Sequence, residues 1–90
     1  MQRTIITVVG KDAVGIIARV CTCLSENNCN ILDISQTITG GYFNMMMVVD
    51  LSNSSKQFME MRKELHDLGE KIGVEIHVQS EEIFNKMHRI

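Results

Sequence analysis

The spacing of apolar residues changes several times along the chain between a strand period of two and a helix period of 3.6. The order in which strand and helix segments follow one another limits the chain to a small set of folds. β-branched residues dominate the first segment, and the later segments alternate or form helical stripes. The predicted elements are a strand at 4–9, a helix at 13–26, strands at 31–39 and 42–51, a helix at 58–73 and a strand at 74–79. The predicted order is β-α-β-β-α-β.

Gly40 and Gly41 separate the second and third predicted strands. Glycines permit the positive φ angles of a tight hairpin, so these two strands should pair antiparallel. With right-handed crossovers, the whole order fits a ferredoxin-like α+β sandwich, a four-stranded antiparallel sheet with two helices on one face. We expect a single domain over residues 1–90, with a core at 1–79 and an extension at 80–90 that forms a short helix capped by Ser80.

Strand alternation predicts which side chains of the hairpin face the core. Met45 and Met47 should point inward and Met46 outward, which favours core filling over soft-metal binding by the methionines. On the second strand, the apolar face should be buried and the polar face exposed to water. That apolar face consists of Leu32, Ile34 and Ile38.

Charge and length exclude several classes of protein. The chain has 90 residues and a formal net charge of −2, which disfavours general binding to nucleic acid phosphates. Its apolar runs are far shorter than the roughly 20 residues that span a bilayer, and its first residues lack the pattern of a signal peptide, so we expect a cytoplasmic protein. A domain of this size is marginally stable alone, and a partner subunit would help it.

The three cysteines are expected to be reduced, because an odd number without an export signal does not indicate a disulfide framework. His66, His77 and His88 show no spacing of metal ligands. No cofactor or metal is therefore predicted. No set of side chains typical of nucleophilic or acid–base catalysis stands out, so an enzyme is disfavoured.

The segment 9–16 is the most informative part of the sequence for function, because a strand ends there and a helix begins. A helix start exposes unpaired backbone N–H groups and about half a unit of positive charge, which suits a carboxylate or a phosphate. Gly15 lets a ligand approach closely, Asp12 could accept from a ligand ammonium group, and Lys11 could contact an anion. The structural alternative is that Gly10 turns the chain, Asp12 caps the helix and Lys11 is solvated.

The turn Gly10-Lys11-Asp12-Ala13-Val14-Gly15-Ile16 and the run 28–36 resemble an ACT domain over nearly the whole chain. The chain is similar to small stand-alone bacterial ACT proteins and to the ACT modules of glycine cleavage system repressors. The resemblance implies a sensor that commonly binds amino acids at a dimer interface. It assigns binding roles to Asp12, Gly15 and Asn30, within a predicted ligand set of Gly10, Lys11, Asp12, Ala13, Val14, Gly15 and Asn30. Many members carry proline before the motif glycine, where this chain has Val14.

The first predicted helix carries more apolar surface than packing on one sheet requires. Its main stripe, assigned to the core, is Val14, Ile17, Ala18, Cys21 and Leu24. A second stripe of Ile16, Val20 and Cys23 predicts a contact with a second subunit, as the family's side-by-side dimers would make. The alternative is a monomer in which this stripe is partly exposed or covered by the tail.

Three other classes of protein share this architecture, and each requires residues that this sequence does not have. A site similar to that of acylphosphatase would need an arginine in the first turn, the connection at residues 10–15 between the first predicted strand and helix. A metal-carrying ferredoxin would need two cysteines there. An RNA-binding sheet would need stacking aromatic residues. We therefore expect a non-catalytic, allosteric regulatory module that is a homodimer, binds an amino acid or a similar small molecule, and acts on another protein. The alternative is a protein-binding module of ACT-like fold without a small ligand.

Overall fold

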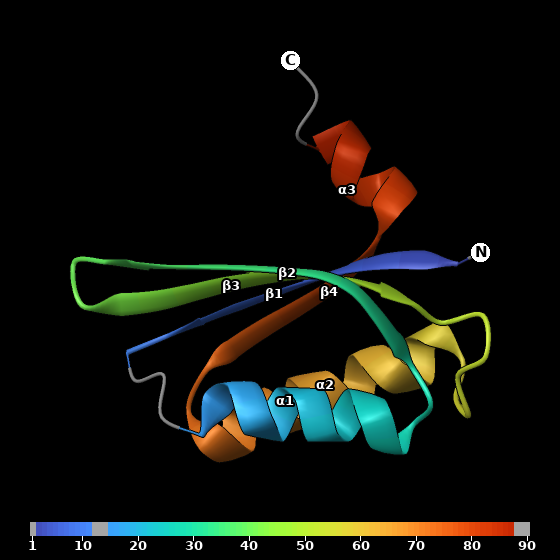
Figure 1. Ribbon diagram of the computed structural model, residues 1–90, viewed down its shortest axis with the longest axis horizontal. Helices are drawn as coiled ribbons and strands as arrows, with labels where there is room; N and C mark the ends of the chain where they lie inside the picture. Colours follow the sequence, from blue (N-terminus) through green and yellow to red (C-terminus); the bar gives the residue numbers. More distant parts are fainter. Residues whose placement is uncertain (1, 12–14, 88–90) are drawn as a thin grey trace.

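The structure is a computed structural model, which describes residues 2–11 and 15–87. The described elements follow the predicted order and end in a short helix (Figure 1). They are β1 (Arg3–Gly10), α1 (Ile16–Glu26), β2 (Asn30–Thr39), β3 (Tyr42–Asp50), α2 (Phe58–Ile72), β4 (Glu75–Ser80) and α3 (Glu81–Met87). None of the helices within these residues combines the length and the apolar character that a membrane span requires.

The four strands form one antiparallel sheet in the order β2-β3-β1-β4. Helices α1 and α2 lie together on one face of it, and α3 projects from the other face (Figure 1). This is the predicted ferredoxin-like sandwich with a short C-terminal helix. The predicted cap of α3 is also confirmed, because the backbone N–H of Ile83 donates to Ser80 Oγ over 3.3 Å.

The β2–β3 hairpin closes through the two predicted glycines. Gly40 and Gly41 have φ angles of 59° and 82°, and Thr39 pairs with Tyr42 across the loop. Positive φ at both central residues is typical of the two-residue turn whose twist matches the strands. The glycine pair thus fixes the register of the hairpin.

The core lies between the sheet and the two helices. Met45 and Met47 are 2% and 0% exposed, whereas Met46 is 41% exposed, which confirms the predicted alternation of β3. Met61 and Leu65 of α2 are buried against this layer, as predicted from their helical spacing. The core methionines are thus packing residues.

The structure corrects the predicted faces of α1. Ile16, Val20 and Leu24 are at most 5% exposed and form the stripe that packs on the sheet, whereas Ala18 is exposed. The helix begins at Ile16, and residues 16, 20 and 24 follow one another at four-residue intervals along the face turned to the sheet. Ile16 and Val20 therefore belong to the core of a single chain and offer no apolar surface to a second subunit.

The predicted burial of the second strand is also corrected. Leu32 and Ile34 are each 38% exposed and Ile38 is 72% exposed. β2 is an edge strand, and only Ile31, near its start, is half-buried. A register shift between Ile31 and Asp33 makes Leu32 an extra residue in the strand. The apolar face of β2 thus extends beyond the cover that α1 provides.

Candidate functional site

A cavity of about 290 Å³ lies where β1 leads into α1, at the predicted first turn. Of the predicted site residues, it brings together Lys11 and Gly15; Asp12, Ala13 and Val14 lie outside the described residues. The far wall comes from the end of α2 and the start of β4. The lining residues are Lys11, Gly15, Ile16, Arg19, Ile72, Gly73 and Val74.

Gly15 gives this cavity its access to the start of α1. Its φ of 78° is left-handed, a conformation that disfavours any side chain, and a Cβ added there would have open space around it. The carbonyl oxygen of Gly15 accepts the N–H of Arg19 over 3.0 Å, so helical hydrogen bonding begins at this residue. The backbone N–H groups that come before Arg19 in α1 have no carbonyl partner within the helix, so they are the unpaired donors typical of a helix start.

The charges around the cavity favour an anion. Lys11 and Arg19 are both exposed and both line it, and none of the lining residues described is acidic. Together with the positive end of the α1 dipole, they provide a field suited to a carboxylate. Arg19 was not among the predicted site residues, which come from the turn at 10–15 and, for Asn30, from the second predicted strand. Its position one helical turn after Gly15 is the signal that could have found it.

Gly10 has a packing role that needs no ligand. It is buried at the end of β1, where a Cβ would stand 2.5 Å from Cγ1 of Val74. Glycine is therefore required for the end of β1 to pack closely against the residue before β4. Gly10 shapes the corner of the site by letting Val74 form its wall.

Asn30 does not join the other predicted site residues within one chain. It pairs with Asp50, which in turn pairs with Arg3 at the beginning of β1. Gly10 instead pairs with Phe43 at the other end of the sheet. Seven steps along a strand separate these two ends by about 23 Å. A single chain therefore cannot use Asn30 and the first turn to bind the same small molecule.

Comparison with known proteins identifies the family. The family model described as ACT domain matches residues 2–79. The chain belongs to the ACT domain family. It is 66% identical to a UPF0237 protein of Bifidobacterium longum over 90 residues, which cover the whole of both chains.

Solved structures agree with this assignment. An ACT domain protein from Streptococcus pneumoniae superposes with a TM-score of 0.82 at 44% identity, over 92% of this chain and 93% of that one. A protein described as a putative glycine cleavage system transcriptional repressor gives a TM-score of 0.75 at 26% identity, over 88% of this chain and 45% of that one. ACT domains are commonly regulatory modules that bind small molecules, and they are typically not catalytic.

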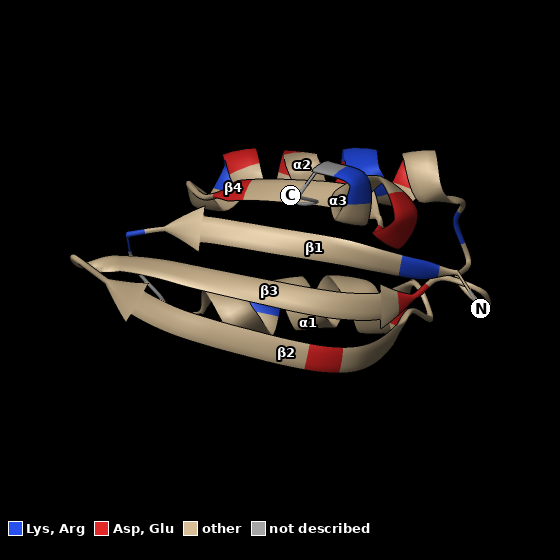
Figure 2. Cartoon of the chain, turned by 90° about the horizontal axis from the view of Figure 1, so that it is seen from above, with Lys and Arg blue, Asp and Glu red and all other residues tan. Residues whose placement is uncertain are grey.

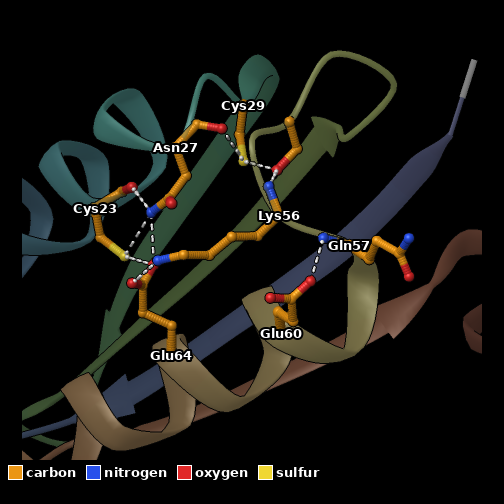
Figure 3. Close-up of polar contacts among 8 residues, drawn as sticks. Cys23, Asn27, Cys29, Lys56, Gln57, Glu60 and Glu64 are labelled. Carbon is orange, nitrogen blue, oxygen red and sulfur yellow. Dashed lines mark hydrogen bonds and ion pairs between the residues drawn. The ribbon is translucent and has the colours of Figure 1, made fainter.

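This ACT domain also has a polar cluster that ties its two main helices together, shown in Figure 3. Glu64 of α2 accepts hydrogen bonds from Cys23 Sγ and Asn27 Nδ2 at the end of α1, and it pairs with Lys56 Nζ. The side chain of Cys23 is thus directed at α2, which corrects its assignment to a subunit interface. Within the described ranges, no three His, Cys, Asp or Glu side chains gather as metal ligands.

The cluster perturbs the titration of its members. Burial, followed by the hydrogen bond to Glu64, raises the pKa of Cys23 to about 12. The hydrogen bond from Lys56 is the largest cause that lowers the pKa of Glu64. Since a thiol with so high a pKa is almost entirely protonated at neutral pH, Cys23 acts as a hydrogen-bond donor in this cluster.

Proposed function

We propose that this ACT domain is a non-catalytic regulatory module that binds an α-amino acid or a similar small carboxylate at the first turn. The observation that carries the proposal is the cavity beside Gly15, which opens onto the start of α1 between the cations Lys11 and Arg19. The ligand carboxylate lies at the helix start and contacts these cations. The carboxylate of Asp12 accepts from the ligand ammonium group, next to Ala13 and Val14 in the same turn.

The binding free energy that such a site must supply is modest. Sensing between micromolar and millimolar concentrations requires about 4–8 kcal/mol of binding free energy. Several backbone N–H contacts and one or two charge-assisted hydrogen bonds supply this amount where part of the ligand is shielded from water. A cavity of about 290 Å³ is at the small end of the range for ligand pockets, which favours an amino acid over a nucleotide.

The functional unit in this proposal is a homodimer formed through β2. This edge strand contains neither lysine nor proline, the residues that commonly prevent edge pairing, and Ile34 and Ile38 are exposed on it. On α1, the half-buried Ile17 and Cys21 lie on the flank opposite Cys23, since successive residues are about 100° apart. They continue the apolar face of β2, so a second copy can cover both elements at once.

A dimer of this kind gives Asn30 a role. When two copies of β2 pair antiparallel about a twofold axis, the start of one strand lies opposite the end of the other. Asn30 of the second copy then comes to the end of the sheet at which the first turn of the first copy lies. Its amide offers a donor and an acceptor for an amino acid at the interface. Ligand binding would therefore stabilise the dimer, and the change would be passed on to a partner protein.

The test is a thermal-shift screen of the twenty amino acids with wild type, Gly15→Ala and Gly41→Ala. A ligand at a hundred times its Kd should stabilise the fold by about 2.7 kcal/mol. Gly15 and Gly41 have φ angles of 78° and 82°, so the two alanines impose similar backbone strain, but Gly41 does not line the cavity. An amino acid that stabilises wild type and Gly41→Ala but not Gly15→Ala supports the proposal.

The contrary results are equally clear. If none of the twenty stabilises wild type, or if Gly15→Ala responds as wild type does, the first turn is not an amino acid site. The alternative function, a protein-binding module without a small ligand, is then favoured by the exposed apolar surface of β2.

A further inference from the structure

A second hollow lies at the opposite edge of the sheet from β2, between α2 and β4. It is a groove of about 390 Å³. Figure 2 shows β4 as the outer strand on this side, with α2 running along it. The helix and the strand each contribute four residues to the lining, which is Met59, Arg62, Lys63, His66, Ile76, His77, Val78 and Gln79.

The groove is basic although the chain carries a net charge of −2. Arg62 and Lys63 are exposed and have no acidic partner among residues 2–11 and 15–87. His66 is 3.1 Å from Glu70, and no acidic residue lines the groove in the part of the chain described. Arg62 and Lys63 therefore give this side of α2 a local positive field.

The strand beside these cations has an open edge. Among the described strands, β4 pairs with β1 alone, so it is an edge strand whose outer side a further strand can join. β4 contains neither lysine nor proline to block strand addition. Met59 is 64% exposed beside this edge and offers an apolar contact to an added strand, whereas Ile76 and Val78 are each only 5% exposed and belong to the core.

We propose that this groove binds an extended, acidic segment of a partner protein, which pairs with β4 as a fifth strand. Backbone hydrogen bonds along β4 provide affinity, and side chains at alternate positions provide specificity. Acidic side chains on the face of the segment that lies toward α2 contact Arg62 and Lys63, and the methylene groups of those side chains pack on Met59. The site is separate from the first turn, so it stands or falls independently of amino acid binding.

The charges argue against two other occupants. A second copy of this chain paired through β4 would bring its own Arg62 and Lys63 toward those of the first, and like charges in contact disfavour association. A nucleic acid needs many phosphate contacts to bind well, and the groove offers two strong cations on a chain of net negative charge. An acidic peptide needs only two or three such contacts together with a strand edge.

The experiment uses capped seven-residue peptides in titrations followed by amide NMR shifts of the whole chain. One peptide alternates Glu and Val, a second alternates Lys and Val, and two further versions of the acidic peptide are N-methylated at odd or at even positions. The expected result is saturable binding of the acidic peptide, with the largest shifts in β4 and α2. One of the two methylated versions should fail, because its methyl groups block the hydrogen bonds to β4.

Charge variants test the role of the helix. Arg62→Gln with Lys63→Gln should weaken binding between about twofold and thirtyfold, the range expected for two exposed ion pairs. The matched control is Lys71→Gln with Lys86→Gln, which removes the same charge outside the groove and should leave the Kd unchanged. The proposal is overturned if the acidic peptide does not bind at 1 mM, if the lysine peptide or both methylated peptides bind equally well, if shifts centre on β2, or if the control pair weakens binding as much.

Discussion

Cys23 should be far less reactive than a free cysteine, although it lies on an accessible groove between α1 and α2. With a pKa of about 12, roughly one thiol in 10⁴ is ionised at pH 8, against about a quarter for a free cysteine. The thiolate is therefore about two thousand times scarcer. Its higher basicity makes it about forty times more nucleophilic in disulfide exchange, so the net rate should be about fifty times lower.

The assay is reaction with an aromatic disulfide in a background of Cys21→Ala and Cys29→Ala, which leaves one thiol. The rate should rise nearly tenfold per pH unit from pH 7 to pH 10 without a plateau. Glu64→Gln should accelerate it, because the negative charge is lost while burial remains. The matched control is Glu60→Gln on the same helix, which should have no effect. A plateau below pH 10, or a Glu64→Gln variant no faster than its parent, would refute the reasoning.

Four further outcomes are expected. Glu64 has a lowered pKa, so its ionised form stabilises the fold above the unfolded pKa of about 4.3, and this stabilisation is lost as the pH falls through the folded pKa. In urea unfolding, Glu64→Gln should therefore lose less stability than wild type between pH 6 and pH 3. Thr4 Oγ1 is buried and has no hydrogen-bond partner among the described residues, so Thr4→Val should stabilise the fold by about 1 kcal/mol in the same assay. A Cβ on Gly69 would stand 2.8 Å from the carbonyl oxygen of Val74, so Gly69→Ala should cost about 1–3 kcal/mol despite alanine's helix preference. Ile38→Lys should leave the monomer folded but abolish the proposed dimer, and a dimer that persists in sedimentation would exclude β2 as its interface.

The fold could be predicted from local signals because each element has its own. Gly40 and Gly41 mark a tight hairpin wherever alternating strands flank them. The helical stripe through Met61 and Leu65 has no competing stripe on α2, so its buried face is unambiguous. Each of these signals depends on residues that are close in the sequence, so it can be interpreted without knowledge of the tertiary structure.

The buried face of α1 and the exposure of β2 could not be obtained in this way. α1 has two apolar stripes, and which one faces the sheet depends on where the helix begins, at Ile16 after the left-handed Gly15. The apolar side chains of β2 follow the pattern of a covered strand, but cover depends on the position of α1 over the sheet. Likewise, Asn30 and Gly10 are turn-associated residues in sequence, yet the antiparallel sheet places them at opposite ends.

The two edges of the sheet differ in chemistry, and this difference has a geometric consequence. A dimer formed through β2 would contain an eight-stranded sheet in which both copies of β4 are the outermost strands. Seven strand intervals of about 4.8 Å place the two basic grooves roughly 34 Å apart. A partner carrying two acidic segments joined by a linker long enough for this span should bind far more tightly than either segment alone, because the second contact becomes intramolecular. That gain should vanish in Ile38→Lys while the affinity for a single segment stays unchanged. Loss of both affinities together would mean that the two edges are not independent.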